Sequence, residues 1–274
     1  ALSHYSWNAR LNLLFLDMAK RLNSKTLTIM GGPNIRTEPA DIKKFLISHK
    51  NLDYYIINEG EESFTNLIGE ILKGRAKPSP AGCATIIEGE FFYTAEPMSK
   101  KSMEIIQPSP YLTGLLDQFL ADPNMIPLLE TNRGCPFRCV YCAWGTMLSK
   151  IRIRPLDQVL KEIEYIAEKS AGQSAWIFCD SNFGILPRDL EIAKKVREVM
   201  DKKGYPTDVT VWQSKNTASR NIEISELLGE KNKGLVAIQS ADPKVLENIG
   251  RGAIRMSSIA EQLNYYHKKN LEVR

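Results

Sequence analysis

Three of the five cysteines of this 274-residue chain lie within the stretch GCPFRCVYCAW, residues 134–144. Cys135, Cys139 and Cys142 have the spacing C-x3-C-x2-C. Three thiolates at this spacing on one loop can hold three corners of an iron–sulfur cluster and leave the fourth iron without a protein ligand. An open iron can bind a small chelating molecule. The spacing therefore predicts a 4Fe-4S cluster with one exchangeable position.

Zinc binding and coincidence are the two alternatives for these thiols. A structural zinc site needs four protein ligands, and neither Cys83 nor any of the three histidines lies at a short spacing that would supply the fourth. The three cysteines could also be unrelated core residues, but the glycine, proline and arginine among them are unusual for a buried apolar element. Cys83 and Cys179 stand apart, and we expect them to be core or strand residues.

The elements that must position this loop begin with alternating helix and strand patterns, which favour a parallel sheet flanked by helices. No strand is expected before the first helix, where Leu11, Leu14, Phe15, Met18 and Leu22 share one face. Helices are predicted over residues 7–22 and 41–50 and after the turn at 57–60, and strands over 26–30 and 52–57.

The character changes between residues 76 and 124, within a region that holds half of the fourteen prolines. One hairpin is expected over 84–94, with its turn at Glu88, Gly89 and Glu90. We interpret 76–124 as a linker between a first domain, residues 1–75, and a second domain, residues 125–274.

The second domain repeats a strand followed by a helix four times and then starts a fifth strand. This pattern is typical of a β/α barrel, whose chemistry lies on loops at the carboxyl ends of the strands. Because a half-built barrel would expose strand edges, we expect the chain to be a fragment of a longer polypeptide. Strands are predicted over 126–131, 174–180, 208–213 and 234–239, and helices over 156–169, 188–203, 221–231 and 257–269.

Composition excludes several classes of protein. The net charge is +4, and basic residues alternate with acidic ones, so neither nucleic acid nor an acidic membrane is expected as a partner. No apolar run approaches the roughly 20 residues of a membrane span, and no signal peptide is recognisable. We therefore expect a cytoplasmic protein, in which clustered thiols indicate a metal or redox site rather than disulfides.

The cysteine spacing, with Tyr141 before the last thiol and a strand before the loop, resembles the radical S-adenosylmethionine (SAM) enzymes. The resemblance implies that the amino and carboxylate groups of SAM chelate the open iron. It also implies reductive cleavage of SAM to a 5′-deoxyadenosyl radical, which removes a hydrogen atom from a small-molecule substrate. A reductant such as flavodoxin or ferredoxin would supply the electron.

Further segments resemble the subgroup that carries an N-terminal cobalamin-binding domain: QPSPYLTG, DSNFG, AIQSADPKVLENIGRG, YSWN, IMGGPNIRTEP and INEGEESF. The resemblance implies part of a Rossmann-like cobalamin domain followed by part of a radical SAM barrel. It implies methyl transfer from methylcobalamin to an unactivated carbon, with a second SAM remethylating cobalt. The Asp-x-His-x-x-Gly motif of some relatives is absent from the sequence, so no axial cobalt ligand is assigned.

The resemblance also implies cofactor contacts, each with a plain structural alternative. The SAM contacts are Tyr141, Trp144, Asp180, Ser181, Asn182, Gln239, Ser240 and Arg251. Capping, loop hydrogen bonds, core packing or a solvated charge would explain the same residues. The cobalamin contacts are Ser6, Gly31, Gly32, Pro33, Glu59, Gly60 and Glu61. Tight turns and a helix N-terminus would explain these.

Two further functions stay open. A radical SAM enzyme without cobalamin could catalyse cyclisation or rearrangement, or modify RNA as methylthiotransferases do, although the latter need cluster cysteines that this chain lacks. A non-catalytic module that binds zinc or a corrinoid is the second.

Overall fold

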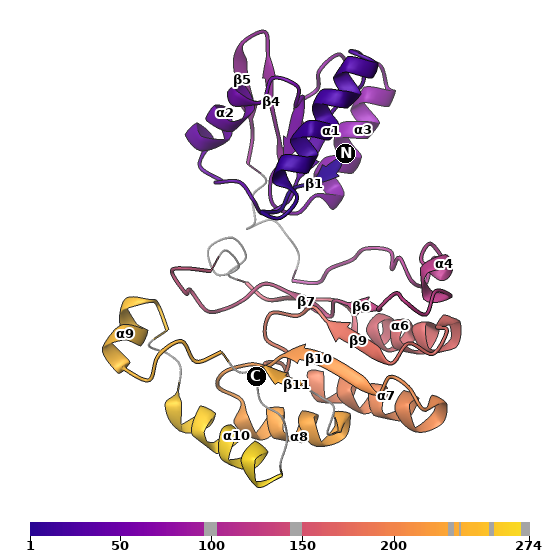
Figure 1. Ribbon diagram of the computed structural model, residues 1–274, viewed down its shortest axis with the longest axis vertical. Coiled ribbons are helices and arrows are strands. Elements are labelled where there is room, and N and C mark those ends of the chain that lie inside the picture. The colour runs from indigo at the N-terminus through magenta and orange to yellow at the C-terminus, as the bar shows by residue number, and fades with distance from the viewer. Residues whose placement is uncertain (96–102, 143–149, 230–232, 236, 252–254, 270–274) are drawn as a thin grey trace. The chain divides into compact units, whose positions relative to one another are not determined.

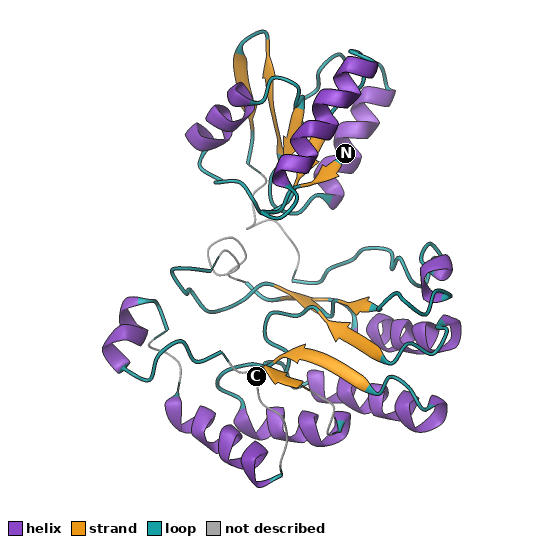
Figure 2. Cartoon of the chain, viewed as in Figure 1, coloured by secondary structure: helices purple, strands orange, loops and turns teal. Residues whose placement is uncertain are grey.

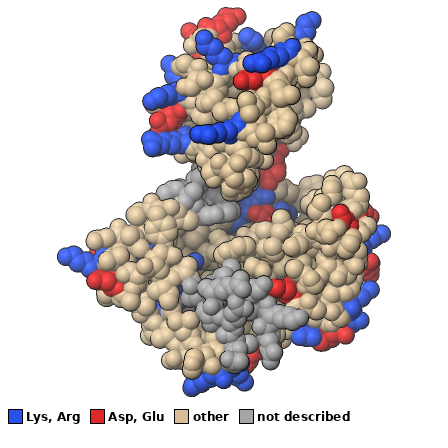
Figure 3. Space-filling model, viewed as in Figure 1, with Lys and Arg blue, Asp and Glu red and all other residues tan. Residues whose placement is uncertain are grey.

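The computed structural model describes residues 1–95, 103–142, 150–229, 233–235, 237–251 and 255–269. The chain forms two compact units, Ala1–Lys101 and Ser102–Arg274. Each unit combines helices with its own sheet (Figures 1 and 2). Lys and Arg side chains are interspersed with Asp and Glu on the visible face of each unit (Figure 3). Within the described ranges, every helix is too short or too polar to cross a bilayer.

The first unit is a five-stranded sheet in the order β1-β2-β3-β4-β5, in which the first three strands are parallel and the last two antiparallel. Parallel neighbours need a crossover connection, which the first two helices provide. The elements are β1 (Leu2–Ser3), α1 (Ala9–Leu22), β2 (Ile29–Gly31), α2 (Pro39–Ser48), β3 (Tyr54–Ile56), α3 (Glu61–Leu72), β4 (Cys83–Ile87) and β5 (Glu90–Tyr93).

Strand β3 lies at the centre of this unit, and its residues alternate between the two faces of the sheet. Tyr55 packs with Leu16 of α1 and Leu46 of α2. Tyr54 packs in a second cluster with Leu67 of α3. The sheet is therefore covered on both faces, which is the usual condition of parallel strands.

Two expectations for this unit are wrong. A strand does precede the first helix: Leu2 and Ser3 pair with Met30 and Gly31, and two residues are too few to show periodicity in the sequence. The hairpin is no linker either, because β4 pairs with β3 and extends the sheet. The boundary between the units falls at residues 101 and 102, and residues 103–124 belong to the second unit.

The shared apolar face of α1 points away from the core of its unit. Leu16 is buried, whereas Leu11, Leu14, Phe15, Met18 and Leu22 are about half exposed or more. A regular apolar spacing thus identified the helix without identifying the side that packs against the sheet.

The second unit has a four-stranded parallel sheet in the order β11-β10-β9-β6, beside a two-stranded antiparallel ribbon, β7-β8. Helices α6, α7, α8 and α10 follow one another along the sheet, as in part of a barrel (Figure 1). The elements are α4 (Asp117–Leu120), β6 (Leu128–Leu129), β7 (Asn132–Arg133), β8 (Arg152–Ile153), α6 (Leu156–Lys169), β9 (Ala175–Phe178), α7 (Asp189–Lys203), β10 (Asp208–Trp212), α8 (Ala218–Leu228), β11 (Lys233–Leu235), α9 (Pro243–Asn248) and α10 (Met256–Lys268).

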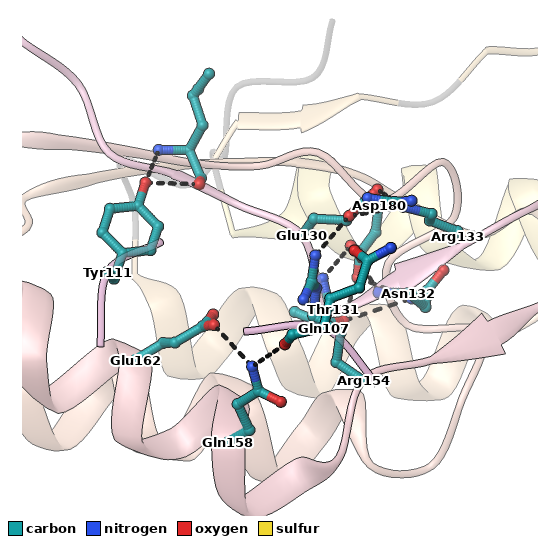
Figure 4. A network of polar contacts seen from close by, with 11 residues as sticks. Gln107, Tyr111, Glu130, Thr131, Asn132, Arg133, Arg154, Gln158, Glu162 and Asp180 are labelled. Carbon is teal, nitrogen blue, oxygen red and sulfur yellow. Dashed lines mark hydrogen bonds and ion pairs between the residues drawn. The ribbon is translucent and has the colours of Figure 1, made fainter. Parts of the chain in front are cut away.

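Strand β6 ends the described sheet, and a tyrosine satisfies its outer edge. The hydroxyl of Tyr111 donates to the carbonyl of Leu128 (2.8 Å) and accepts from the N–H of the same residue (3.0 Å; Figure 4). One side chain thus pairs both backbone groups that a neighbouring strand would otherwise pair. Residues 103–124 therefore act as part of the second unit rather than as a linker.

Replacement of Tyr111 by Phe leaves two backbone groups of β6 without their partner. We expect Tyr111→Phe to lower the free energy of unfolding by about 1–3 kcal/mol. Urea denaturation, followed by the fluorescence of buried Trp176, measures the change. Tyr265→Phe is the control, because the Tyr265 hydroxyl bonds exposed Glu226, and its effect should stay within about 0.5 kcal/mol. Equal effects of the two changes would contradict a special role for Tyr111.

Candidate active site

The three clustered cysteines lie on one loop, which follows β7. Cys135 and Cys139 are buried and Cys142 is half-buried. The N–H of Cys142 donates to the carbonyl of Cys139 (3.0 Å) and makes the end of the motif a tight turn. Tyr141 is exposed, and Trp144 lies outside the described residues. Of the remaining two thiols, Cys83 is buried in β4 and Cys179 is exposed just after β9.

A buried carboxylate fastens the start of this loop to the end of β9. Asp180 accepts hydrogen bonds from the backbone N–H groups of Thr131 (2.7 Å) and Asn132 (3.2 Å), the Asn132 amide (2.8 Å) and the Thr131 hydroxyl (Figure 4). Burial raises the pKa of Asp180 to about 7, against the lowering effect of these hydrogen bonds. Its oxygens are therefore committed within the protein.

The two residues after Asp180 also contact the cysteine loop. The Ser181 hydroxyl donates to the carbonyl of Gly134 (2.7 Å). The Asn182 amide donates to the Cys135 sulfur (3.1 Å) and accepts from the Lys215 ammonium (2.9 Å). The segment predicted to contact SAM is thus hydrogen-bonded to the cysteine loop.

Arg251 reaches the same loop from a distant part of the chain. The N–H of Val140 donates to the carbonyl of Ile249 (3.1 Å). At Gly250, which has a φ of 71°, a Cβ would come within 2.3 Å of the Arg138 carbonyl oxygen. This close approach requires glycine. Arg251 follows with only 3% exposure, and its Nε and Nη1 have no hydrogen-bond partner among the described residues.

Gln239 and Ser240, which were also predicted to contact SAM, are less buried than Arg251. Gln239 is exposed and has a left-handed backbone, with φ 64°. The Ser240 hydroxyl accepts from the N–H of Asp242 (3.1 Å), which itself caps α9. Ser240 thus makes a loop hydrogen bond, and the SAM contacts of Gln239 and Ser240 remain predictions.

A charged cluster beside the loop was missed by the sequence analysis. Glu130 accepts from the guanidinium groups of Arg133 (2.9 Å) and Arg154 (3.2 Å), and a third arginine, Arg188, donates to the Arg154 carbonyl (2.5 Å; Figure 4 shows the Glu130 pairs). Lys215, shortly after β10, was missed as well. The available signal was position, because Glu130, Arg154 and Lys215 each follow the end of a strand.

Two cations, Lys215 and Arg251, lie near the cysteine loop. Burial lowers the pKa of Lys215, nearby Arg251 lowers it further, and the sulfurs of all three clustered cysteines act in the opposite direction. Lys215 also lies 5.7 Å from the centre of the Phe137 ring. The donor set thus consists of three soft sulfur ligands with cations beside them, which suits an anionic iron–sulfur cluster. Within the described ranges, no three potential ligand side chains are already grouped for a metal ion.

The residues predicted to contact cobalamin gather at one edge of the first sheet. Ser6 follows β1, Gly31 to Pro33 end or follow β2, and Glu59 to Glu61 follow β3. These three parallel strands are neighbours, so their carboxyl ends adjoin. The predicted residues therefore lie together, as a binding edge requires.

The glycine loop of this edge has a structural requirement of its own. A Cβ on Gly32, with φ 128°, would lie 2.6 Å from the His4 carbonyl oxygen. The Tyr55 hydroxyl donates to the Gly32 carbonyl (3.0 Å), so the His4 Nδ1–H donates to that hydroxyl (2.9 Å) and Nε2 accepts from Asn34 (3.1 Å). Burial lowers the pKa of His4 and favours this neutral form. Gly32 is thus explained without a ligand.

The comparisons with known proteins cover both units. A family model described as "Radical SAM superfamily" matches residues 129–273. The chain is 32% identical over 280 residues to "2-(S-pantetheinyl)-carbapenam-3-carboxylate methyltransferase" of Streptantibioticus cattleyicolor, and 31% identical over 281 residues to "Cobalamin-dependent radical SAM methyltransferase TokK" of Streptomyces tokunonensis. Each alignment covers 99% of this chain and 40% of the relative.

A solved structure has the same fold. The cobalamin-dependent SAM radical enzyme OxsB, determined with aqua-cobalamin and SAM bound, aligns with a TM-score of 0.68 at 20% identity. The alignment covers 100% of this chain and 40% of that one. The fold of the two α/β units is therefore shared with a larger protein.

In Asp180→Asn, an NH2 group replaces one carboxylate oxygen. This NH2 group would face the hydrogen-bond donors of Thr131 and Asn132, which it cannot accept from. We expect Asp180→Asn to lower the free energy of unfolding by about 1–3 kcal/mol, measured by urea denaturation. Asp157→Asn is the matched control, because the Asp157 side chain is 73% exposed. Loss of stability in both variants to the same extent would refute the role of the buried hydrogen bonds.

The raised pKa of Asp180 also predicts a pH dependence. Between its ordinary value of 3.8 and its folded value of about 7, the folded chain binds more protons than the unfolded chain. This group's contribution to stability is therefore complete below about pH 4 and is lost as pH rises toward 7, by up to about 1.4 kcal/mol per unit. Denaturation curves of the parent and Asp180→Asn between pH 4 and 8 isolate it. The stability difference between the two should change over this window; a constant difference would contradict the assignment.

Proposed function

This chain belongs to the radical SAM superfamily, and on that premise we propose that it provides the cluster-binding and cobalamin-binding regions of a methyltransferase. One observation carries the proposal: three thiols share a loop at the strand ends, beside half-buried Lys215 and buried Arg251. Cys135, Cys139 and Cys142 would hold a 4Fe-4S cluster. When bound, the reduced cluster and SAM supply one-electron cleavage of the sulfonium and removal of a hydrogen atom from an unactivated carbon.

The chain's own residues prepare this site. Asp180 fixes the strand end against the start of the loop, and Ser181 and Asn182 fix the loop itself. The thiols are not yet grouped among the described residues, so cluster binding must draw them together. The turn at Gly250 keeps Arg251 against the loop during that adjustment.

Arg251 is the residue best suited to hold the carboxylate of SAM. Its guanidinium is buried, and two of its nitrogens lack a partner among the described residues. A guanidinium pairs with a carboxylate through two parallel hydrogen bonds. Asp180 is poorly suited to hold the SAM ammonium, because four donors already occupy its oxygens.

Cobalamin would bind at the carboxyl edge of β1, β2 and β3. Two observations support this: the predicted residues gather there, and both curated relatives are named methyltransferases, one of them cobalamin-dependent. The substrate would be a small molecule, and a flavodoxin or ferredoxin would deliver electrons. All five cysteines are thiols rather than disulfides, which suits the reducing cytoplasm.

Removal of any clustered thiol should abolish cluster binding. We expect the parent, reconstituted anaerobically with iron and sulfide, to hold about four irons per chain. Cys135→Ala, Cys139→Ala and Cys142→Ala should each hold less than about a quarter of that iron and form no 5′-deoxyadenosine from SAM and dithionite. Cys179→Ala is the control and should keep the full iron content. Zinc in place of iron in the parent, or iron loss in the control, would contradict the proposal.

A substitution at Gly60 tests whether this edge binds a cofactor or is only a structural turn. Its φ is −93°, and a Cβ there would meet only the Ile56 Cγ2 at 3.7 Å, so Gly60→Val should fold normally. The added side chain should weaken cobalamin binding at least about tenfold, or about 1.4 kcal/mol. Equilibrium dialysis with hydroxocobalamin measures the affinity. Gly69→Val, also on α3 with open space around it, should bind as the parent does.

Two results of that dialysis would count against cobalamin. If the parent binds no cobalamin but forms 5′-deoxyadenosine, the chain is a radical SAM protein without a corrinoid. If Gly60→Val binds cobalamin as tightly as the parent, the cofactor does not lie at this edge.

A further inference from the structure

The Asn182 amide uses all of its hydrogen-bonding groups inside the protein. The residue is only 2% exposed. Its NH2 group donates to the Cys135 sulfur (3.1 Å) and to the Ser181 hydroxyl (3.1 Å), and its oxygen accepts from Lys215 (2.9 Å). A side chain bound in this way is poorly placed to contact a cofactor's amino group.

The chemistry of its partners fixes the orientation of this amide. A lysine ammonium has donors and no acceptor, so the group facing Lys215 must be the oxygen Oδ1. The Ser181 hydroxyl gives its own proton to the carbonyl of Gly134 (2.7 Å), so toward Asn182 it is an acceptor. The remaining hydrogen of the NH2 group therefore points to the sulfur of Cys135.

The charge behind the amide has no carboxylate partner. Among the ion pairs formed by described residues, none involves Lys215. Among the described residues, the sulfurs of Cys135, Cys139 and Cys142 oppose the lowering of its pKa. Lys215 is half-buried, and a cation partly removed from water is costly unless an anion compensates it. A cluster held by these sulfurs would supply the compensating anion.

We propose that Lys215 and Asn182 form a relay that raises the reduction potential of the cluster bound at Cys135. The inference rests on the proposed function, because it requires that the three thiols hold a 4Fe-4S cluster. One electron passes from an external reductant to the cluster, which gains one negative charge. The ammonium polarises the amide, and the amide N–H donates to the cysteine sulfur, so both stabilise that charge. Hydrogen bonds to sulfur and local charge are established determinants of cluster potential.

Lys215→Met tests the charge while preserving the approximate length of the side chain. The full chain is reconstituted, iron and sulfide are counted, and the midpoint potential is determined by electron paramagnetic resonance during a dithionite titration. At a fixed solution potential, the ratio of reduced to oxidised cluster should fall about tenfold, equivalent to about 59 mV for one electron. Asn182→Leu, which removes the N–H donor, should also lower the ratio of reduced to oxidised cluster. Lys161→Met removes a lysine whose side chain is 65% exposed and should leave the ratio unchanged.

A second measurement needs no variant at this site. The parent protein, grown with asparagine that carries 15N in the side-chain amide, should show an altered electron spin echo modulation from the reduced cluster. The change is expected because the amide nitrogen lies one hydrogen bond from a cluster ligand. A spectrum identical to that of the unlabelled protein would overturn the relay, even if the variants at Lys215 and Asn182 failed to load iron.

The outcomes separate this inference from the function on which it rests. A parent that binds no iron, or forms no 5′-deoxyadenosine, contradicts the proposed function. A parent with a full cluster whose potential is the same in Lys215→Met overturns the relay alone. A lowered potential in Lys215→Met and Asn182→Leu, with Lys161→Met unchanged, supports it.

Discussion

The buried carboxylate of Asp180 is the interaction on which the second unit's site depends. Parallel strands bring their carboxyl ends to one edge, but the segments that leave these ends need not stay together. Asp180 joins two of them, because it accepts four hydrogen bonds from Thr131 and Asn132, where the chain leaves β6 for the cysteine loop. Leaving any of these buried donors unpaired would be costly. The fold therefore fixes the start of the loop before any cofactor is present.

Local pattern was enough to find most elements. The amphipathic spacing predicted α6 at its observed bounds, Leu156–Lys169, and the turn at Glu88 and Gly89 predicted the hairpin. The pattern failed where long-range pairing decides. Strand β1 has two residues and exists because Met30 and Gly31 pair with it, and the predicted strand 126–131 shortens to Leu128–Leu129 because the next residues turn into β7.

In the candidate site, too, local sequence pattern predicted some features, whereas others depend on contacts between distant parts of the chain. The cysteine spacing identified the family without any structure, because ligand spacing on a loop is itself a local property. The role of Asp180 could not be identified in this way, since a carboxylate at a strand end suits a ligand or a cap equally well. Its partners lie about fifty positions earlier in the chain, and only the fold brings them within hydrogen-bond distance. The sequence likewise does not reveal that Arg251 is buried, or that Lys215 lies near the three cysteine sulfurs.

Two cations near the thiols, buried Arg251 and half-buried Lys215, form no ion pair with an acid among the described residues. Arg251 has unpartnered nitrogens among the described residues, and Lys215 faces sulfur rather than carboxylate. Neither charge is paired with an acid among the described residues, and an uncompensated charge that is removed from water opposes folding. In the proposed function, anionic groups at the three thiols and at Arg251 would remove that cost, so cofactor affinity and folding stability would be linked. Asp180 thus fixes the start of the loop, whereas the proposed cluster would both draw the thiols together and compensate the cations beside them.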